Sequence, residues 1–138
     1  NWVVSSARTW DHDFILLELL PHMHLRGSSA KYTAYYPDGT SEVLLDVPQY
    51  DYNWQTTYEF AEYKRMPAGT RIEWEITYDN SAEKAAQARF NSDEAVRFGG
   101  PTTDEMDLGW LTWCYAEENK WPERDYRRGG SQDDAGTD

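Results

Sequence analysis

Two histidines stand one residue apart in the sequence, at His22 and His24. Side chains of an extended strand alternate between its two faces, so residues i and i+2 project together with Cα atoms about 6–7 Å apart. If this run is extended, the two imidazoles share one face and Met23 points away. Imidazole nitrogens and a thioether sulfur form a soft ligand set that suits Cu(I), whereas an oxygen-rich set suits calcium or magnesium. Two histidines and one methionine on copper would leave an open position at which dioxygen could bind.

The same residues also fit a purely structural role. A His-x-His pair at a strand end can hydrogen-bond to its neighbours, and a downstream methionine such as Met106 can fill the core. Taken alone, the pair does not distinguish a metal site from ordinary packing.

Further motifs accompany the histidine pair in a fixed order. The pair lies in residues 21–27 (PHMHLRG), and residues 102–106 (TTDEM) lie far downstream. The motifs between them are YPDG at 36–39, YDYNWQ at 50–55, PAGT at 67–70 and YDNSA at 78–82. From about Phe14 to Tyr115, the chain resembles the C-terminal catalytic domain of copper type II, ascorbate-dependent monooxygenases, in particular their bacterial branch. That family includes peptidylglycine α-hydroxylating monooxygenase and dopamine β-monooxygenase.

The resemblance implies one copper ion held by His22, His24 and Met106, where dioxygen binds and a C–H bond of a small-molecule substrate is hydroxylated. It also implies ascorbate or another one-electron donor, and a second copper held by three histidines of an N-terminal domain. The sequence has three histidines, and only His12 lies outside the motif. The second site is therefore expected in another protein chain or in a missing N-terminal domain. Because the chain begins at Asn1 rather than Met, we expect that a leader or a domain was removed upstream.

Residues next to the expected ligands could orient those ligands or line the place where the substrate binds. Asp104 and Glu105 precede the methionine and could orient it or a histidine N–H, although they could equally cap a turn. Peptide-amidating relatives hold a substrate carboxylate through an Arg two residues before the first His and through Asn and Tyr two and four residues after the Met. Those positions are Leu20, Leu108 and Trp110 here. Replacing one charged and two hydrogen-bonding residues by apolar ones favours a substrate with a hydrophobic or aromatic C–H bond over a peptide with a C-terminal glycine. The three residues could also simply belong to the core.

The hydrophobic pattern predicts an all-β fold. Short β-rich runs are separated by turn signals, and Ile72, Trp74, Ile76 and Tyr78 alternate with polar residues as in a half-buried strand. The expected strands cover residues 14–20, 31–36, 41–47, 54–60, 70–78 and 106–115. Many short strands without β-α alternation predict an antiparallel, jelly-roll-like β-sandwich over residues 1–120. One short helical insertion is expected near 81–90, with Ser81 as its N-cap.

Composition limits the classes of partner and compartment. The net charge of −12 argues against nucleic acid and against anionic membrane surfaces. No apolar run approaches the roughly 20 residues that a transmembrane helix needs. The single Cys114 excludes an internal disulfide and is expected to be a buried structural thiol. The cysteine content does not indicate the compartment, and it is the resemblance that implies a secreted bacterial protein, periplasmic or extracellular.

The C-terminal residues 121–138 are rich in Gly and Asp, and we expect this polar tail to pack on a neighbour in an oligomer or larger assembly. Two alternatives to an enzyme remain open at this point. One is a non-catalytic copper-binding or structural subunit of an assembly. The other is a β-sandwich carbohydrate-binding module, which would use the many Trp and Tyr residues as aromatic platforms.

Overall fold

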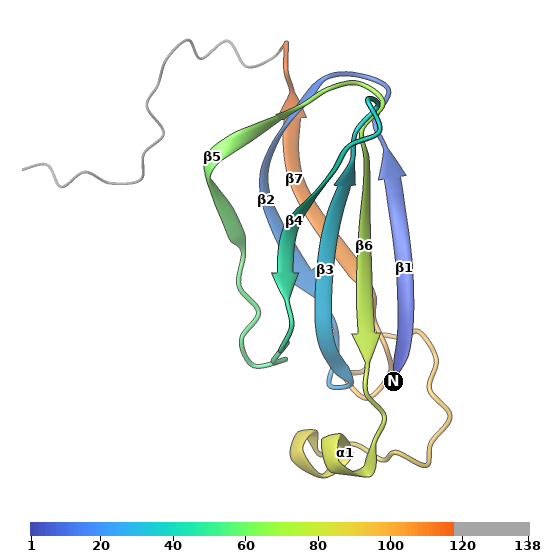
Figure 1. Cartoon of the computed structure of the whole chain (residues 1–138). Coiled ribbons are helices and arrows are strands. Elements are labelled where there is room, and N and C mark those ends of the chain that lie inside the picture. The colour runs from blue at the N-terminus through green and yellow to red at the C-terminus, as the bar shows by residue number, and fades with distance from the viewer. Residues whose placement is uncertain (118–138) are drawn as a thin grey trace, which may run out of the picture.

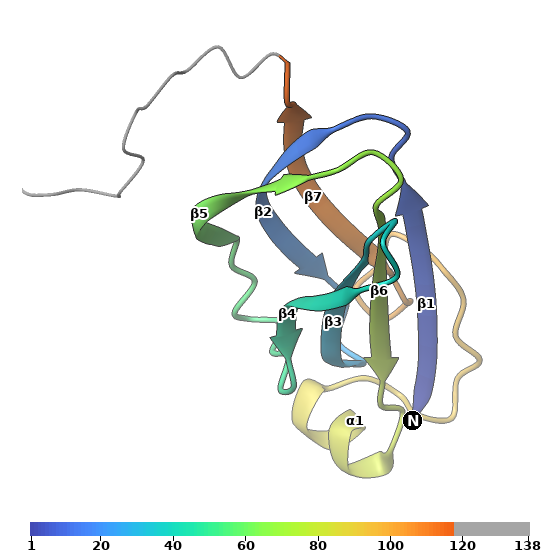
Figure 2. The same cartoon turned by 45° about the horizontal axis from the view of Figure 1, so that its top comes forward.

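A computed structural model of the chain describes residues 1–117, which form two antiparallel sheets packed face to face (Figures 1 and 2). The expected tail at 121–138 lies outside the described residues. The elements in chain order are β1 (Trp2–Thr9), β2 (Phe14–His22), β3 (Gly27–Tyr35), β4 (Ser41–Val47), β5 (Tyr58–Met66), β6 (Arg71–Tyr78), α1 (Ala82–Ala88) and β7 (Leu108–Tyr115). One sheet has the order β1-β6-β3-β4 and the other the order β5-β2-β7. The expected all-β sandwich with one helical insertion is confirmed.

The core lies between the sheets because each strand turns its apolar residues inward. Phe14, Leu16 and Leu19 of β2 meet Tyr32 of β3 and Ile72 of β6 in one buried cluster. A second buried cluster lies nearer the end of β2 and comprises Met23, Ala30, Tyr50, Ile76 and Tyr78. Within residues 1–117, no helix is long and apolar enough to cross a bilayer.

The connections between strands bring the segment after β2 and the helix α1 to one end of the sandwich. Every connection between strands, except the β3–β4 hairpin, passes from one sheet to the other. The hairpin turns where Gly39 adopts a φ of 86°, a left-handed conformation that glycine accepts without strain. The β2-to-β3 connection and α1 lie at the same end of the molecule in both views (Figures 1 and 2).

One strand was not predicted, and several strand boundaries differ from the sequence prediction. β3 begins at Gly27 rather than at residue 31, and β5 extends to Met66 rather than ending at residue 60. The edge strand β1 was not predicted, because its run of Ser, Ala, Arg and Thr gives a weak apolar alternation. β5 begins at Tyr58 rather than Trp54, because residues 51–54 form a turn in which the Asp51 side chain accepts the Asn53 N–H. β7 begins at Leu108, so Met106 lies in the segment that leads into the strand.

The predicted helix is present as α1. Its N-cap is Ser81, whose hydroxyl oxygen accepts the Lys84 backbone N–H at 3.2 Å. The helix ends at Arg89, whose φ of 61° and ψ of 47° are left-handed. The positions on either side of the helix, Asn80 and Phe90, both belong to the contacts that fix α1 against the sandwich end.

Candidate metal centre

The two histidines lie where the chain leaves one sheet for the other. His22 is the last residue of β2, and His24 is buried in the connection to β3 with an exposure of 4%. Their ring centroids are 5.4 Å apart and the ring planes are nearly perpendicular, at 86°. Metal–nitrogen bonds of about 2.0 Å place two imidazoles of one ion with their centroids about 5 Å apart. The pair therefore fits two ligands of a single ion.

Hydrogen bonds leave the same nitrogen available on both rings. His22 Nδ1 lies 2.5 Å from Oε1 of Gln55, and His24 Nδ1 lies 3.2 Å from the carbonyl oxygen of Asp104. The Gln55 amide is itself oriented by its Nε2, which donates to the Tyr52 carbonyl at 2.9 Å. Both acceptors are oxygens without a proton, so each Nδ1 carries the hydrogen. In the neutral rings, each Nε2 then has a free lone pair, which is the arrangement by which protein groups orient metal-ligating histidines.

Met106 lies between two contacts that reach the histidines. Two residues before it, the carbonyl of Asp104 accepts from His24. Two residues after it, Leu108 is the Cα partner of His22 in the antiparallel pairing of β2 with β7. Residues 1–117 contain no group of three or more His, Cys, Asp or Glu side chains placed to hold an ion. A site at this pair accordingly needs a ligand of another type, and the thioether of Met106 is in the adjoining segment.

The loop between β4 and β5 clamps the strand end that carries the histidines. The Tyr50 hydroxyl accepts the backbone N–H of Met23 at 3.1 Å and donates to the Met23 carbonyl at 2.8 Å. Burial raises the pKa of Tyr50, which keeps this hydroxyl protonated. The Tyr52 ring lies edge-on to the His24 ring, with centroids 6.4 Å apart. The sequence showed this loop only as a motif, and its contacts with the histidine segment were not foreseen.

A tight turn follows His24 and requires a glycine. The Gly27 N–H donates to the His24 carbonyl at 2.9 Å. A Cβ on Gly27 would lie 2.6 Å from Cβ of Met23, closer than side-chain atoms approach one another. The glycine thus allows the close packing of Met23, the residue between the two histidines.

Arg26 joins the histidine turn to both neighbouring segments and is only 1% exposed. Its guanidinium donates to the carbonyl of Thr103 and, at 3.1 Å, to that of Asn91. Its Nε donates to Oδ1 of Asn80 at 2.9 Å. The guanidinium carbon also lies 4.2 Å from the centroid of the Phe90 ring. Arg26 therefore fixes the segment before Met106 and the segment after α1, a role that the sequence analysis did not assign.

Asp104 and Glu105 act through their main chains in this structure. Asp104 contacts His24 with its carbonyl oxygen, not with its carboxylate. The backbone of Glu105 pairs with Arg97 and Gly99. Burial raises the pKa of the Glu105 carboxyl, and the nearby Arg26 charge opposes that rise. Among residues 1–117, neither carboxylate hydrogen-bonds to an imidazole.

The three residues expected at the substrate rim share a sheet face with His22. Leu20 is the Cα partner of Trp110, as His22 is of Leu108. Alternation along β2 puts Leu20 and His22 on one face, and the intervening Pro21 is buried on the other. Trp110 is 56% exposed, so it is not a core residue.

His12 and Cys114 lie at the other end of β2 and β7, where Phe14 pairs with Tyr115. His12 Nδ1 is 2.6 Å from the Asp11 carboxylate, and its ring lies 4.4 Å from that of Tyr115. Cys114 is partly exposed, so the expectation of a buried thiol is wrong. Neither residue contributes to the centre at His22.

Comparison with known proteins adds no assignment to this geometry. The sequence matches no protein-family model, and a search of curated proteins finds no match. The resemblance to copper monooxygenases thus remains a prediction from the motifs.

Proposed function

We propose that His22, His24 and Met106 hold one copper ion, and that the chain is the oxygen- and substrate-binding half of a copper-dependent monooxygenase. The observation that carries the proposal is the hydrogen bond between His24 Nδ1 and the Asp104 carbonyl. It orients a ligand nitrogen and also ties the methionine segment to the histidine pair. A bound copper would supply one-electron redox chemistry and an open position for dioxygen.

The chain's own residues would hold the ligands rigidly. Gln55 and the Asp104 carbonyl fix the two ring orientations, and Tyr50 fixes the backbone between them. Outer contacts of this kind support metal affinity because they limit the rotation of the ligands. The exposed face with Leu20, Leu108 and Trp110 would receive an apolar or aromatic C–H donor beside His22. Measurable amidation of glycine-extended peptides would contradict this choice of substrate.

Electrons would have to come from outside the described residues. The third histidine, His12, lies at the opposite end of β2, and the chain therefore cannot build a three-histidine second site around it. Ascorbate or another one-electron donor, and a second copper domain or partner chain, belong to the proposal. So does a periplasmic or extracellular location.

The test is anaerobic Cu(I) loading, followed by elemental analysis and X-ray absorption at the copper edge. The three methionines provide a matched control: Met106→Leu removes the proposed ligand, and Met66→Leu removes a fully buried core thioether beside Phe14. We expect one copper with nitrogen and sulfur scatterers in the native chain and in Met66→Leu. We expect loss of the sulfur scatterer in Met106→Leu alone.

Other outcomes separate the alternatives. One copper whose spectrum is unchanged in Met106→Leu would refute the ligand set. Retained copper without hydroxylation, when an electron donor and a partner domain are supplied, would favour a non-catalytic copper-binding subunit. Absence of tight copper combined with saccharide affinity would favour a carbohydrate-binding module.

A further inference from the structure

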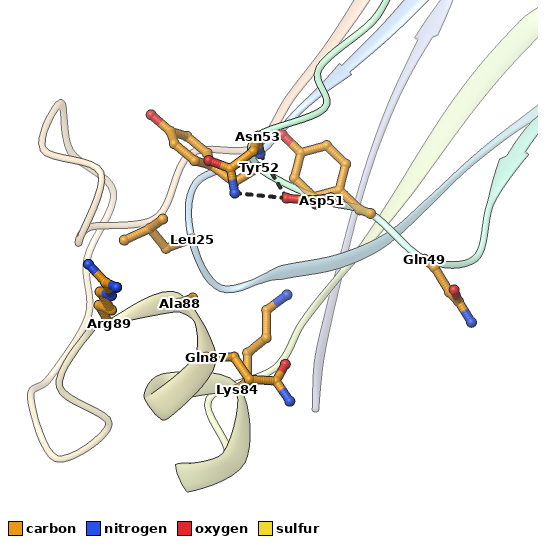
Figure 3. A pocket seen from close by; sticks show the side chains of 10 residues that line it. Leu25, Gln49, Asp51, Tyr52, Asn53, Lys84, Gln87, Ala88 and Arg89 are labelled. Atoms are coloured by element: carbon orange, nitrogen blue, oxygen red, sulfur yellow. Dashed lines mark hydrogen bonds between the residues drawn. The ribbon is translucent and has the colours of Figure 1, made fainter.

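An open pocket of about 710 Å³ lies between α1 and the loop that follows β4 (Figure 3). Volumes of this size are typical of small-molecule sites. The pocket adjoins the histidine pair, because Leu25 in its wall directly follows His24 and the ring of Tyr52 in its wall lies 6.4 Å from the His24 ring. The pocket therefore lies next to the segment that carries His24, although His24 itself does not line it.

The wall formed by α1 is cationic, although the whole chain has a net charge of −12. Lys84 and Arg89 both line the pocket, and within residues 1–117 neither forms a salt bridge. Figure 3 shows Lys84 extending from the helix toward the loop that carries Tyr52 and Asn53. The pocket thus has two positive charges that no carboxylate of the described chain neutralises by direct contact.

The nearby carboxylates are held by uncharged donors instead. Oδ1 of Asp51 accepts the backbone N–H of Asn53 at 2.8 Å and the Asn53 side-chain amide at 3.1 Å. Oδ1 of Asp79 accepts the Ser81 N–H at 2.9 Å, and Lys84 acts on Asp79 only through its longer-range field. Both aspartates shape their own turns and neither forms an ion pair with Lys84 or Arg89. Because Asp51 also lines the pocket, the lining carries two positive charges and one negative charge.

The backbone at Arg89 gives an independent reason to look for a role of its side chain. Arg89 is the one non-glycine residue with positive φ among residues 1–117. A left-handed helix end is usually glycine, since a Cβ there costs about 1 kcal/mol. Strained residues of this kind concentrate at functional sites. An arginine at this position is consistent with a side chain that is needed at the pocket rim.

The cationic wall is also fixed in place before any ligand arrives. Ala85 of α1 is buried, and Phe90, directly after Arg89, is buried under the guanidinium of Arg26. Because Arg26 belongs to the turn that follows His24, the wall and the histidine pair are held by one residue. A preformed wall lowers the ordering cost of binding.

We propose that this pocket binds a small organic anion with an apolar or aromatic body, with its charge attracted by Lys84 and Arg89 in the wall and its body against Leu25 and Tyr52. The pocket shares no residue with the face of Leu20, Leu108 and Trp110, so this inference concerns a separate site and does not depend on the proposed function. Charge-assisted hydrogen bonds to the two cations would select an anion over a neutral analogue.

The test uses the full, metal-free chain and two probes of one shape, 3-phenylpropionate and its neutral amide, 3-phenylpropanamide. Calorimetry or NMR titration measures their affinities for the native chain and for Lys84→Gln, Arg89→Gly and Lys31→Gln. Lys31 is an exposed cation of β3 outside the pocket and controls for net charge. We expect the carboxylate to bind at least about fivefold more tightly than the amide, and each pocket variant to lose about that factor. Lys31→Gln should bind as the native chain does.

Arg89→Gly adds a readout that unfolding cannot imitate, because removing the left-handed strain should raise the melting temperature while affinity falls. Equal binding of acid and amide, equal losses in Lys31→Gln, or no binding of either probe at millimolar concentration would overturn the inference. Copper stoichiometry, measured separately, distinguishes the two proposals. Normal copper without probe binding refutes only the anion pocket, and probe binding without copper refutes only the metal centre.

Discussion

Replacing Tyr50 by Phe removes one buried oxygen and leaves two main-chain groups without a partner. The pairing of β2 with β7 ends at His22, and the Tyr50 hydroxyl takes over by bonding both the N–H and the C=O of Met23. A buried polar group left unsatisfied costs about 1–3 kcal/mol. Two such groups are left unsatisfied in Tyr50→Phe. Part of this cost is offset because the variant no longer has to bury a hydroxyl. We therefore expect the free energy of unfolding to fall by about 2–4 kcal/mol.

Urea denaturation of the metal-free protein measures this loss. Tyr52→Phe is the matched control, since Tyr52 lies in the same loop and is only partly buried. Its change should stay within about 0.5 kcal/mol, as for ordinary surface substitutions. Hydrogen exchange of the Met23 amide should also accelerate in Tyr50→Phe. A Tyr50→Phe protein as stable as Tyr52→Phe would refute the assignment of Tyr50 as the clamp of the histidine segment.

Three further predictions concern the surroundings of the centre and the opposite end of the sandwich. Arg26→Gln should lower the free energy of unfolding by about 3 kcal/mol or more, because buried carbonyls lose charge-assisted donors, and Arg26→Lys should not restore it fully. An Arg26→Lys protein as stable as the native chain in urea denaturation would contradict the need for the planar guanidinium group. Gly27→Ala should cost about 2 kcal/mol or more through overlap with the Met23 side chain, whereas Gly100→Ala, which meets no atom within 4 Å, should melt as the native protein does; similar melting temperatures for the two variants would exclude this crowding. Hydrogen bonds from Lys64 and Tyr36 lower the pKa of Glu42 below its ordinary 4.5, so the stability that Glu42 contributes is complete above that pH and is lost as the pH falls through the folded-state pKa. The difference in free energy of unfolding between the native chain and Glu42→Gln, about 0.5–1 kcal/mol at neutral pH, should therefore shrink below about pH 4.5. A constant difference down to about pH 3 would contradict this prediction.

The parts of the fold that the sequence predicts are those with a strong local signal. The alternation in β6, the Pro-Asp-Gly hairpin turn and the Ser81 cap each act over a few residues, and each is found in the structure. The start of β5 could not be predicted, because a β-rich stretch such as residues 54–57 can be either a strand or an extended loop. Its state depends on whether β2 offers a partner, which is a tertiary contact.

The candidate site also has a part that local sequence predicts and a part that depends on contacts between distant residues. The nearness of His22 and His24 could be predicted from their spacing of two residues, although only His22 lies in the strand β2 and His24 lies in the connection that follows it. The acceptors that orient these rings could not be predicted, because Gln55 is 33 residues from His22 and Asp104 is 80 residues from His24. That Asp104 uses its carbonyl rather than its carboxylate is invisible to any argument from residue type.

The 80 residues that separate His24 from the Asp104 carbonyl also bear on when the centre can form during folding. β7 is the last strand of the described chain and pairs only with β2, so its docking closes one of the longest loops in the fold. Loops of that length close late, after local hairpins such as β3–β4 have formed. Until then the chain would present two imidazoles without the methionine. On the proposed function, selectivity for copper over zinc would be acquired only at this final closure, and metal supplied to the finished sandwich should load more faithfully than metal present while the chain folds.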